Sequence, residues 1–394
     1  GMQNYLQKKR KRTHNHNGSL QDPFFFERGV IMRRLGISIY PEKDTEEHIH
    51  TYLKQAADFG AKRIFSCLLS VTKNPEEIKA EFKRMNRHAH ELGFEVVLDV
   101  SPKVFSKLGI SYSDLSFFQE IEADGIRLDQ GFTGNEEAMM TYNPQGLSIE
   151  INMSNNTHTV DTIMDYEPDT YHLTGCHNFY PHRYTGLPLD HFISCTQNFK
   201  KYGLHTAAFV GCASEDCFGP WIAKEGLCTL EMHRNLPLDV QIKHMIEIGL
   251  IDDILISNCY PSEEEMRRLK KLDLSLVTFE VDPLESLPEL FHKVIFDELQ
   301  MNRGDVNENM IRSTQTRVKY ASETFPIFNA PAIIKRGDVM VESSLHGHYA
   351  GEVQIAKADM ENTGLTNVIG HVREEELFLL DDLRPWQKFR FVEK

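Results

Sequence analysis

The chain has 394 residues, of which 41% are hydrophobic and 26% charged, so it can bury a large core and is expected to form more than one domain. Its formal net charge of −15 argues against a nucleic-acid partner and against binding to an anionic membrane surface, because both need a basic surface. No apolar run reaches 18 residues, so we also expect no membrane-spanning segment.

The first 31 residues differ in character from the rest of the chain. Residues 8–12 read KKRKR, and neither the apolar stretch of a signal peptide nor a helical period follows them. A basic run of this kind is also found in nuclear-localisation signals and anionic-surface patches. Because Met32 stands just before the first predicted strand, we expect residues 1–31 to be an upstream extension without a functional role.

Eight short apolar runs end in polar or charged residues, and an amphipathic segment follows each of them. Strand-sized runs that alternate with helix-sized segments predict a parallel sheet of the α/β class. A count of eight favours a closed (β/α)8 TIM barrel, here residues 32–273, over an open doubly wound sheet. The runs are 34–42, 62–70, 94–102, 125–132, 147–154, 170–181, 204–212 and 252–261.

The segments between these runs carry helix signals. The helix predicted at 74–93 has Asn74 as its cap, Pro75 in its first turn and Gly93 as its stop. The connection over residues 211–234 is much longer than a usual strand-to-helix loop, so we interpret it as a lid or substrate wall, with a purely structural hairpin as the alternative. The other predicted helices are 44–60, 113–125, 135–143, 157–168, 188–203, 237–249 and 262–273.

After residue 273 the helical rhythm gives way to short alternating or β-branched runs separated by Gly, Pro, Asn and Asp. This pattern predicts a second, compact β-barrel domain over residues 274–394. The strand-like runs are 274–281, 288–298, 312–321, 331–343, 348–360, 367–374 and 378–382.

Carboxylates lie at the ends of three neighbouring barrel strands. Asp99 ends the third run, Asp129 the fourth and Glu150 the fifth, with Arg127 and Asn152 on the same faces as their neighbours two residues away. Carboxylates from adjacent strand ends are the groups that acid/base cleavage of a glycosidic bond requires. The alternative is a structural ion pair that closes this end of the barrel.

The segment 175–188, which follows the sixth run, predicts a ligand-binding loop. His177, Asn178, Tyr180 and Arg183 combine an aromatic face for a sugar ring with groups that bind hydroxyls or phosphate. The alternative is an aromatic corner that packs against the second domain.

We expect no metal and no cofactor. Three histidine pairs have i, i+2 spacing, and in the two pairs on predicted helices this places the rings on different faces. The third pair, His346 and His348, lies in a predicted turn and could ligate, but no Cys or carboxylate with zinc-ligand spacing accompanies it. Phosphate-binding glycine motifs for nucleotides are absent. The seven cysteines lie mostly inside apolar runs, a pattern typical of reduced thiols in a cytoplasmic protein. The histidine pairs are His48/His50, His88/His90 and His346/His348.

Five motifs stand out along the chain: RLGISIYPE, GIRLDQGF, HNFYPHRYTGL, TLEMHR and NRGDVNENMIRSTQTR. Together they resemble a bacterial family represented by the MupG-type 6-phospho-N-acetylmuramidases, over about residues 33–394. The resemblance implies a TIM barrel followed by a cyclophilin-like β-barrel, and hydrolysis of the bond between 6-phospho-N-acetylmuramic acid and N-acetylglucosamine in peptidoglycan recycling.

From the resemblance and the strand-end positions we expect a cofactor-free glycosidase acting on a phosphorylated amino-sugar disaccharide. Asp129 and Glu150 are the first candidates for the acid and the base, with Asp99 in reserve. Another sugar-phosphate barrel enzyme and a non-catalytic sugar- or protein-binding module remain alternatives, and the sequence leaves the oligomeric state open, a homo-oligomer included. The substrate-binding candidates are Arg127, Asn152, His177, Asn178, Tyr180, Arg183 and Glu231.

Overall fold

The computed structural model describes residues 32–68, 72–129, 131–221 and 224–394, and Arg33–Lys394 form one compact unit. The predicted extension over residues 1–31 lies outside the described residues. Among the described helices, none combines the length and the apolar character needed to cross a bilayer.

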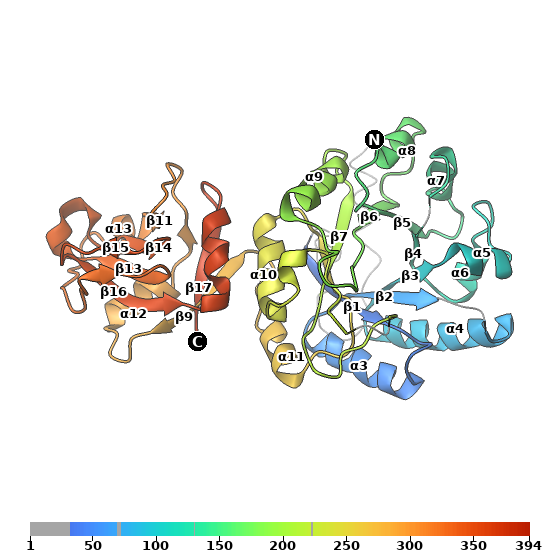
Figure 1. Ribbon diagram of the computed structural model, residues 1–394, viewed down its shortest axis with the longest axis horizontal. Coiled ribbons are helices and arrows are strands. Elements are labelled where there is room, and N and C mark those ends of the chain that lie inside the picture. Colours follow the sequence, from blue (N-terminus) through green and yellow to red (C-terminus); the bar gives the residue numbers. More distant parts are fainter. Residues whose placement is uncertain (1–31, 69–71, 130, 222–223) are drawn as a thin grey trace, which may run out of the picture. The chain divides into compact units, whose positions relative to one another are not determined.

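The first sheet confirms the predicted TIM barrel. Its strands are all parallel, and β8 pairs with β1 to close the ring (Figure 1). Nearly all strand residues are buried, as expected where helices cover the outside and side chains fill the inside. The strands are β1 (Arg34–Ile39), β2 (Arg63–Leu68), β3 (Glu95–Val100), β4 (Gly125–Leu128), β5 (Ser148–Asn152), β6 (Leu173–Cys176), β7 (His205–Val210) and β8 (Asp253–Ile256).

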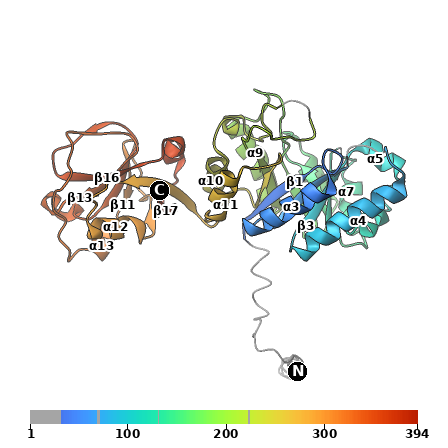
Figure 2. The ribbon, with the colours of Figure 1, turned by 90° about the horizontal axis from the view of Figure 1, so that it is seen from below.

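Helices surround this barrel, and α3 and α4 lie side by side on its outside (Figures 1 and 2). The sequence signals operate as expected in α4, where the Asn74 side chain accepts a hydrogen bond from the Glu76 N–H at 2.9 Å. The short α5 was not predicted. The helices are α3 (Glu46–Asp58), α4 (Pro75–Glu91), α5 (Pro102–Lys107), α6 (Ser116–Glu120), α7 (Asn135–Met140), α8 (Thr159–Asp165), α9 (Leu189–Lys200), the 3₁₀-helix η1 (Glu231–His233), α10 (Leu238–Ile248) and α11 (Glu263–Lys270).

The second sheet follows α11 and has the order β10-β17-β9-β16-β13-β14-β11. It is antiparallel except where β17 pairs with β9. Near its two edges, the Arg303 N–H donates to the Arg312 carbonyl at 2.9 Å, so the sheet is nearly closed. The strands are β9 (Val277–Pro283), β10 (Gln300–Met301), β11 (Met310–Ser313), β13 (Asp338–Glu342), β14 (Val353–Ala356), β16 (Thr366–Val372) and β17 (Lys388–Glu393), and a separate pair is formed by β12 (Ile333–Ile334) and β15 (Met360–Glu361).

Three of the strand-like runs in this region are wholly or mostly helical, namely 288–298, 312–321 and 378–382, so those predictions were wrong. Residues 288–298 contain α12 (Glu289–Phe296), because Phe291, Val294 and Ile295 recur with a helical spacing and are buried together. Residues 378–382 lie in the 3₁₀-helix η3 (Glu374–Asp382), and α13 (Gln315–Lys319) follows β11. The predicted boundary near residue 273 falls between α11 and β9 and stays a prediction.

A buried cluster of charges closes the amino-terminal end of the barrel. Arg63, which begins β2, is 2% exposed. Its Nη1 lies 2.9 Å from Asp253 Oδ2, and its Nη2 donates to both oxygens of Glu150 at 2.7 and 2.6 Å. Arg34, at the start of β1, binds the same Asp253 through Nε at 2.8 Å and Glu95 through Nη1 at 2.7 Å. Because charged pairs fill this end, ligand chemistry is expected at the other end.

Replacement of Arg63 by Met is expected to leave Glu150 and Asp253 buried without their shared partner. We therefore predict that Arg63→Met lowers the free energy of unfolding of the barrel by about 3–5 kcal/mol. Guanidinium unfolding followed by far-ultraviolet circular dichroism measures this loss. Arg267→Met is the matched control, because Arg267 pairs with Glu264 on the exposed face of α11 and its loss should change stability little. Equal effects of the two variants would contradict the central role of Arg63.

Candidate functional site

Asp99, Arg127 and Asp129 lie together at the carboxyl ends of β3 and β4. Asp99 and Arg127 are direct neighbours in the register of these strands. Arg127 Nη1 is 3.7 Å from Asp99 Oδ1 and 3.6 Å from Asp129 Oδ1. The Arg127 side chain is 4% exposed, whereas those of Asp99 and Asp129 are 19% and 54% exposed. One enclosed positive charge therefore lies between two carboxylates that solvent reaches to different degrees.

Asn178, in the loop after β6, fixes the other side of Arg127. Its side-chain oxygen accepts from Arg127 Nη2 at 2.5 Å, and its backbone carbonyl accepts from the Thr229 hydroxyl at 2.7 Å. The guanidinium is thus held by groups from three separate strand ends. Such a group can stabilise negative charge on a neighbour without reorienting.

The pKa of Asp99 is raised to about 6, mainly because the carboxyl is buried. Arg127 opposes this rise, while the negative charges of Asp129 and Glu150 add to it. A carboxyl with this pKa exchanges a proton close to neutral pH, which is the property of a general acid.

Glu150 has a different environment from the other two carboxylates. It is 1% exposed, and both of its oxygens accept from Arg63. It is the register partner of Arg127 on β5, but its carboxylate is bound to Arg63, at the start of β2. Asn152 ends β5 and accepts a hydrogen bond from the Ser154 N–H at 2.7 Å, which shapes the turn that follows.

His177 is enclosed completely, with 0% exposure. Its ring nitrogens lie 3.0 Å from Ser154 Oγ and 2.7 Å from Thr196 Oγ1, and its ring stacks on Phe192 at 4.5 Å. Burial, with smaller contributions from His191 and Arg127, lowers its pKa to about 3. The ring is therefore neutral and occupied on both sides, which fits a role in holding the loop.

The ligand loop predicted at 175–188 packs against the long connection 211–234. The Tyr180 N–H donates to the Cys228 carbonyl at 3.0 Å. Glu231 accepts from Arg234 Nε at 2.7 Å and from the Tyr184 N–H. A Cβ at Gly186 would lie 2.8 Å from the Glu231 nitrogen, so only glycine permits this approach. Glu231 thus ties the two loops together.

Two of the cavities at this end of the barrel are lined by predicted site residues, whereas a third, beside Pro41 and Lys73, is not. The first, here called the loop cavity, has a volume of about 300 Å³ and contains both basic and acidic side chains. The Arg183 side chain is exposed there, while its N–H donates to Glu225 Oε2 at 2.6 Å. The polar side chains that define the loop cavity are those of Arg183, Ser214, Glu215, Lys224, Glu225, Arg234, Asn235 and Asn258.

The second, here called the aromatic cavity, has a volume of about 410 Å³ and adjoins Asp129. Tyr112 and Phe132 are 40% and 43% exposed, and their ring centroids are 6.1 Å apart. The sequence analysis did not single out this pair: Phe132 closely follows β4, but Tyr112 lies beyond α5, so only the fold shows that the two rings are neighbours. The aromatic cavity is defined by Val100, Phe105, Ser106, Ile110, Ser111, Tyr112, Leu128, Asp129, Gly131 and Phe132.

The structure thus brings Asp99, Arg127, Asp129 and Asn178 into one cluster, and it places Arg183 in the loop cavity. Glu150, His177 and Glu231 are engaged by other side chains or by backbone groups. Arg63 and Ser154, which hold two of the predicted residues, gave no signal in the sequence.

A closed parallel barrel with carboxylates at the carboxyl ends of its strands defines a TIM-barrel protein with an arrangement typical of glycosidases. Residues 35–271 match the N-terminal domain, and residues 277–392 the C-terminal domain, of proteins described as 6-phospho-N-acetylmuramidase. The chain belongs to the 6-phospho-N-acetylmuramidase family.

Two solved structures are similar over most of the chain. An uncharacterized protein from B. cereus is 45% identical, with a TM-score of 0.83, and the match covers 92% of this chain and 100% of that one. A conserved protein of unknown function from Enterococcus faecalis is 22% identical, with a TM-score of 0.67 and coverage of 92% and 96%, so it supports the fold alone. No curated protein matches the chain.

Proposed function

We propose that this protein hydrolyses the glycosidic bond between 6-phospho-N-acetylmuramic acid and N-acetylglucosamine. The carrying observation is the cluster of Asp99, Arg127 and Asp129 at the end of the barrel where TIM-barrel enzymes hold their active sites. The family supports the substrate class. We further place the reaction in the recycling of peptidoglycan in the cytoplasm of a bacterium, which would fit the reduced cysteines.

In this proposal Asp99 is the general acid. Because its pKa is raised to about 6, about half of the Asp99 carboxyl is protonated at pH 6 and about a tenth at pH 7, and the protonated form donates its proton to the departing glycosidic oxygen. Asp129, which is more exposed and adjoins the aromatic cavity, assists at the anomeric carbon, where water finally adds. Arg127 holds both carboxylates in place. Sequence reasoning ranked Asp99 third, and the buried pairing of Glu150 with Arg63 is the reason for placing it first.

The two cavities suit the two chemical parts of such a substrate. The rings of Tyr112 and Phe132 offer faces on which a sugar stacks. Arg183 and Lys224 offer positive charge in the loop cavity for a phosphate or a lactyl carboxylate. Local positive charge is needed because the chain as a whole carries −15.

The first test is hydrolysis of the phosphorylated disaccharide, with release of N-acetylglucosamine as the readout. Asp99→Asn and Asp129→Asn are each expected to lower kcat by about 10²–10⁴, because each removes a group that moves a proton or assists at the reacting carbon. Asp165→Asn, which alters an exposed carboxylate on α8, is the matched control and should keep full activity. Glu150→Gln tests the sequence-based ranking, since a loss equal to that of Asp99→Asn at unchanged stability would return Glu150 to the mechanism.

Unchanged rates in both aspartate variants would remove these carboxylates from the mechanism. Micromolar binding of the disaccharide without turnover by the unaltered protein would favour a non-catalytic binding module instead.

A second prediction concerns recognition of the phosphate. Arg183→Gln is expected to raise KM for the phosphorylated disaccharide by roughly 10–100-fold, the effect of losing a hydrogen bond to a charged group. Hydrolysis of the same disaccharide without its phosphate should be unaffected. Steady-state kinetics on the two substrates separate these effects. An equal rise in KM for both would mean that Arg183 contacts another part of the sugar.

A third prediction follows from the pKa of Asp99. The proposed acid must be protonated, so kcat/KM should fall as pH rises past about 6. The charge of Asp129 raises this pKa, so the alkaline limb of the residual activity of Asp129→Asn should move to lower pH. A pH–rate profile of both proteins measures the shift. A limb that stays in place when Asp99 is replaced by Asn would assign it to another group.

A further inference from the structure

Helix α10 carries a stripe of charged residues at Asp239, Lys243 and Glu247, spaced by four, and each of them is buried. Two of the three have an ion-pair partner in the second half of the chain. Asp239 Oδ2 lies 2.6 Å from Nη1 of Arg373, and Lys243 Nζ lies 3.1 Å from Oε2 of Glu376. By the same pattern, the carboxylate of Glu247 is expected to have a partner of opposite charge, which must be positive.

Glu247 has no such partner among the described residues. It is 1% exposed, and neither of its carboxylate oxygens takes part in a hydrogen bond. Arg384 is close, but its Nη1 donates to the backbone carbonyl of Glu247 at 2.7 Å, not to the side chain. A buried carboxylate without hydrogen bonds is costly, so a cation or a proton is needed to neutralise it.

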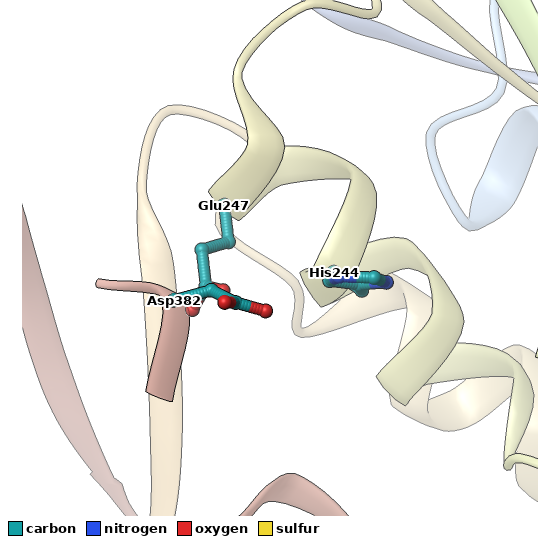
Figure 3. Close-up of side chains that lie close together, drawn as sticks. All are labelled: His244, Glu247 and Asp382. Carbon is teal, nitrogen blue, oxygen red and sulfur yellow. The ribbon is translucent and has the colours of Figure 1, made fainter. Parts of the chain in front are cut away.

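Two further ligand groups surround this carboxylate. His244 lies one turn earlier on the same face of α10, and Asp382 is the last residue of η3 (Figure 3). One ligand atom from each of His244, Glu247 and Asp382 lies within 4.8 Å of the other two. Tetrahedral bonds of about 2.1 Å would bring such atoms to about 3.4 Å apart. Metal binding would therefore need small side-chain rotations, for which the exposed Asp382 has the most freedom.

The His244 ring is prepared to act as a ligand. It is 0% exposed, and its Nδ1 lies 2.7 Å from Nε2 of His233, while its own Nε2 has no hydrogen-bond partner. If Nδ1 donates its proton to His233, the lone pair on Nε2 is available to a metal. Burial lowers the pKa of His244 to about 4, so the ring is neutral, as ligation requires.

We propose that His244, Glu247 and Asp382 bind a divalent transition-metal cation that links α10 to η3. One imidazole nitrogen and two carboxylates form a ligand set suited to zinc and less suited to magnesium, which prefers oxygen ligands only. A cavity of about 420 Å³ adjoins the three residues and leaves room for water to complete the coordination. The site lies away from Asp99 and Asp129, so its proposed role is to hold the two parts of the chain together.

The prediction that the chain holds no metal rested on closely spaced histidine pairs and on zinc-ligand spacing along the sequence. The proposed ligands are His244 and Glu247, in an H-x-x-E pattern on one helix, and Asp382, far along the chain. A motif with fixed ligand spacing therefore does not predict them.

The test is zinc binding by isothermal titration calorimetry on the full chain, freed of metal by a chelator. The unaltered protein is expected to take up one equivalent that Glu247→Gln does not, and Asp382→Asn should weaken this binding at least 10-fold. Asp381→Asn is the matched control, because Asp381 pairs with Arg336 at 2.9 Å and is not a ligand, and it should still take up one equivalent of zinc. Zinc that binds to histidines elsewhere in the chain binds equally to Glu247→Gln, so the difference between the two titrations reports the proposed site alone. Gln has the shape of Glu without its charge, so this variant is expected to fold, which circular dichroism verifies.

Proton release supplies a second readout. Burial, together with the charges of Asp382 and Asp381, raises the pKa of Glu247 to about 9, against the opposing charge of Arg384. The other titratable or charged groups near the cluster are His244, with His233 behind it, and Lys357, which acts on Asp382. At neutral pH Glu247 is therefore protonated without metal, and zinc binding should release about one proton. Titrations in buffers of different ionisation enthalpy measure this number.

The proposal is wrong if the unaltered protein takes up no zinc, cobalt or manganese at millimolar concentrations, or if Glu247→Gln binds zinc as tightly as the unaltered protein. Glu247 would then be a neutral carboxyl that shares its proton with Asp382. None of these measurements uses the disaccharide, so their outcome is independent of the proposed hydrolysis.

Discussion

The need to neutralise buried charge governs the interior of the barrel. Arg63 enters the core from the start of β2, and water cannot solvate it there. Asp253 from β8 and Glu150 from β5 supply its counter-charges, so the three residues tie together strands that are distant in the sequence. This pairing engages both oxygens of Glu150. Of the three carboxylates predicted for the site, Asp99 and Asp129 are then left, on either side of the second buried arginine, Arg127.

The two buried arginines have different surroundings and therefore different uses. The Arg63 guanidinium has hydrogen-bonded carboxylates on two sides, which is a purely structural arrangement. Arg127 is hydrogen-bonded to Asn178, but it stands more than 3.5 Å from Asp99 and Asp129, and its Nε has no partner. A loosely paired arginine beside a carboxyl with a raised pKa is typical of sites where charge develops during a reaction.

The fold was largely predictable because it follows from patterns formed by residues close together in the sequence. Alternating apolar runs and capped amphipathic segments are properties of neighbouring residues, so all eight strands of the barrel and most of its helices were found. The segment 288–298 failed because its β-branched residues also satisfy a helical period, and packing against the second sheet decided between the two.

The site was predictable only as a set of strand ends. That Asp99, Asp129 and Glu150 lie near one another follows from the topology, but which of them is engaged depends on Arg63, which begins another strand. Burial of His177 likewise depends on Ser154 and Thr196, and neither spacing nor composition reveals those contacts. A single sequence does not reveal which side chains pair when they are far apart in the chain.

Helix α10 packs its apolar residues into the barrel core and supplies Asp239 and Lys243 to ion pairs with residues after β9. This sharing limits how the protein could have evolved. A recombination event that exchanged the second sheet for an unrelated domain would have to supply new ion-pair partners for Asp239 and Lys243. Without them, both charges would be left unpaired. The two halves of the chain are thus expected to be inherited together, and substitutions on α10 are expected to be compensated by substitutions near η3.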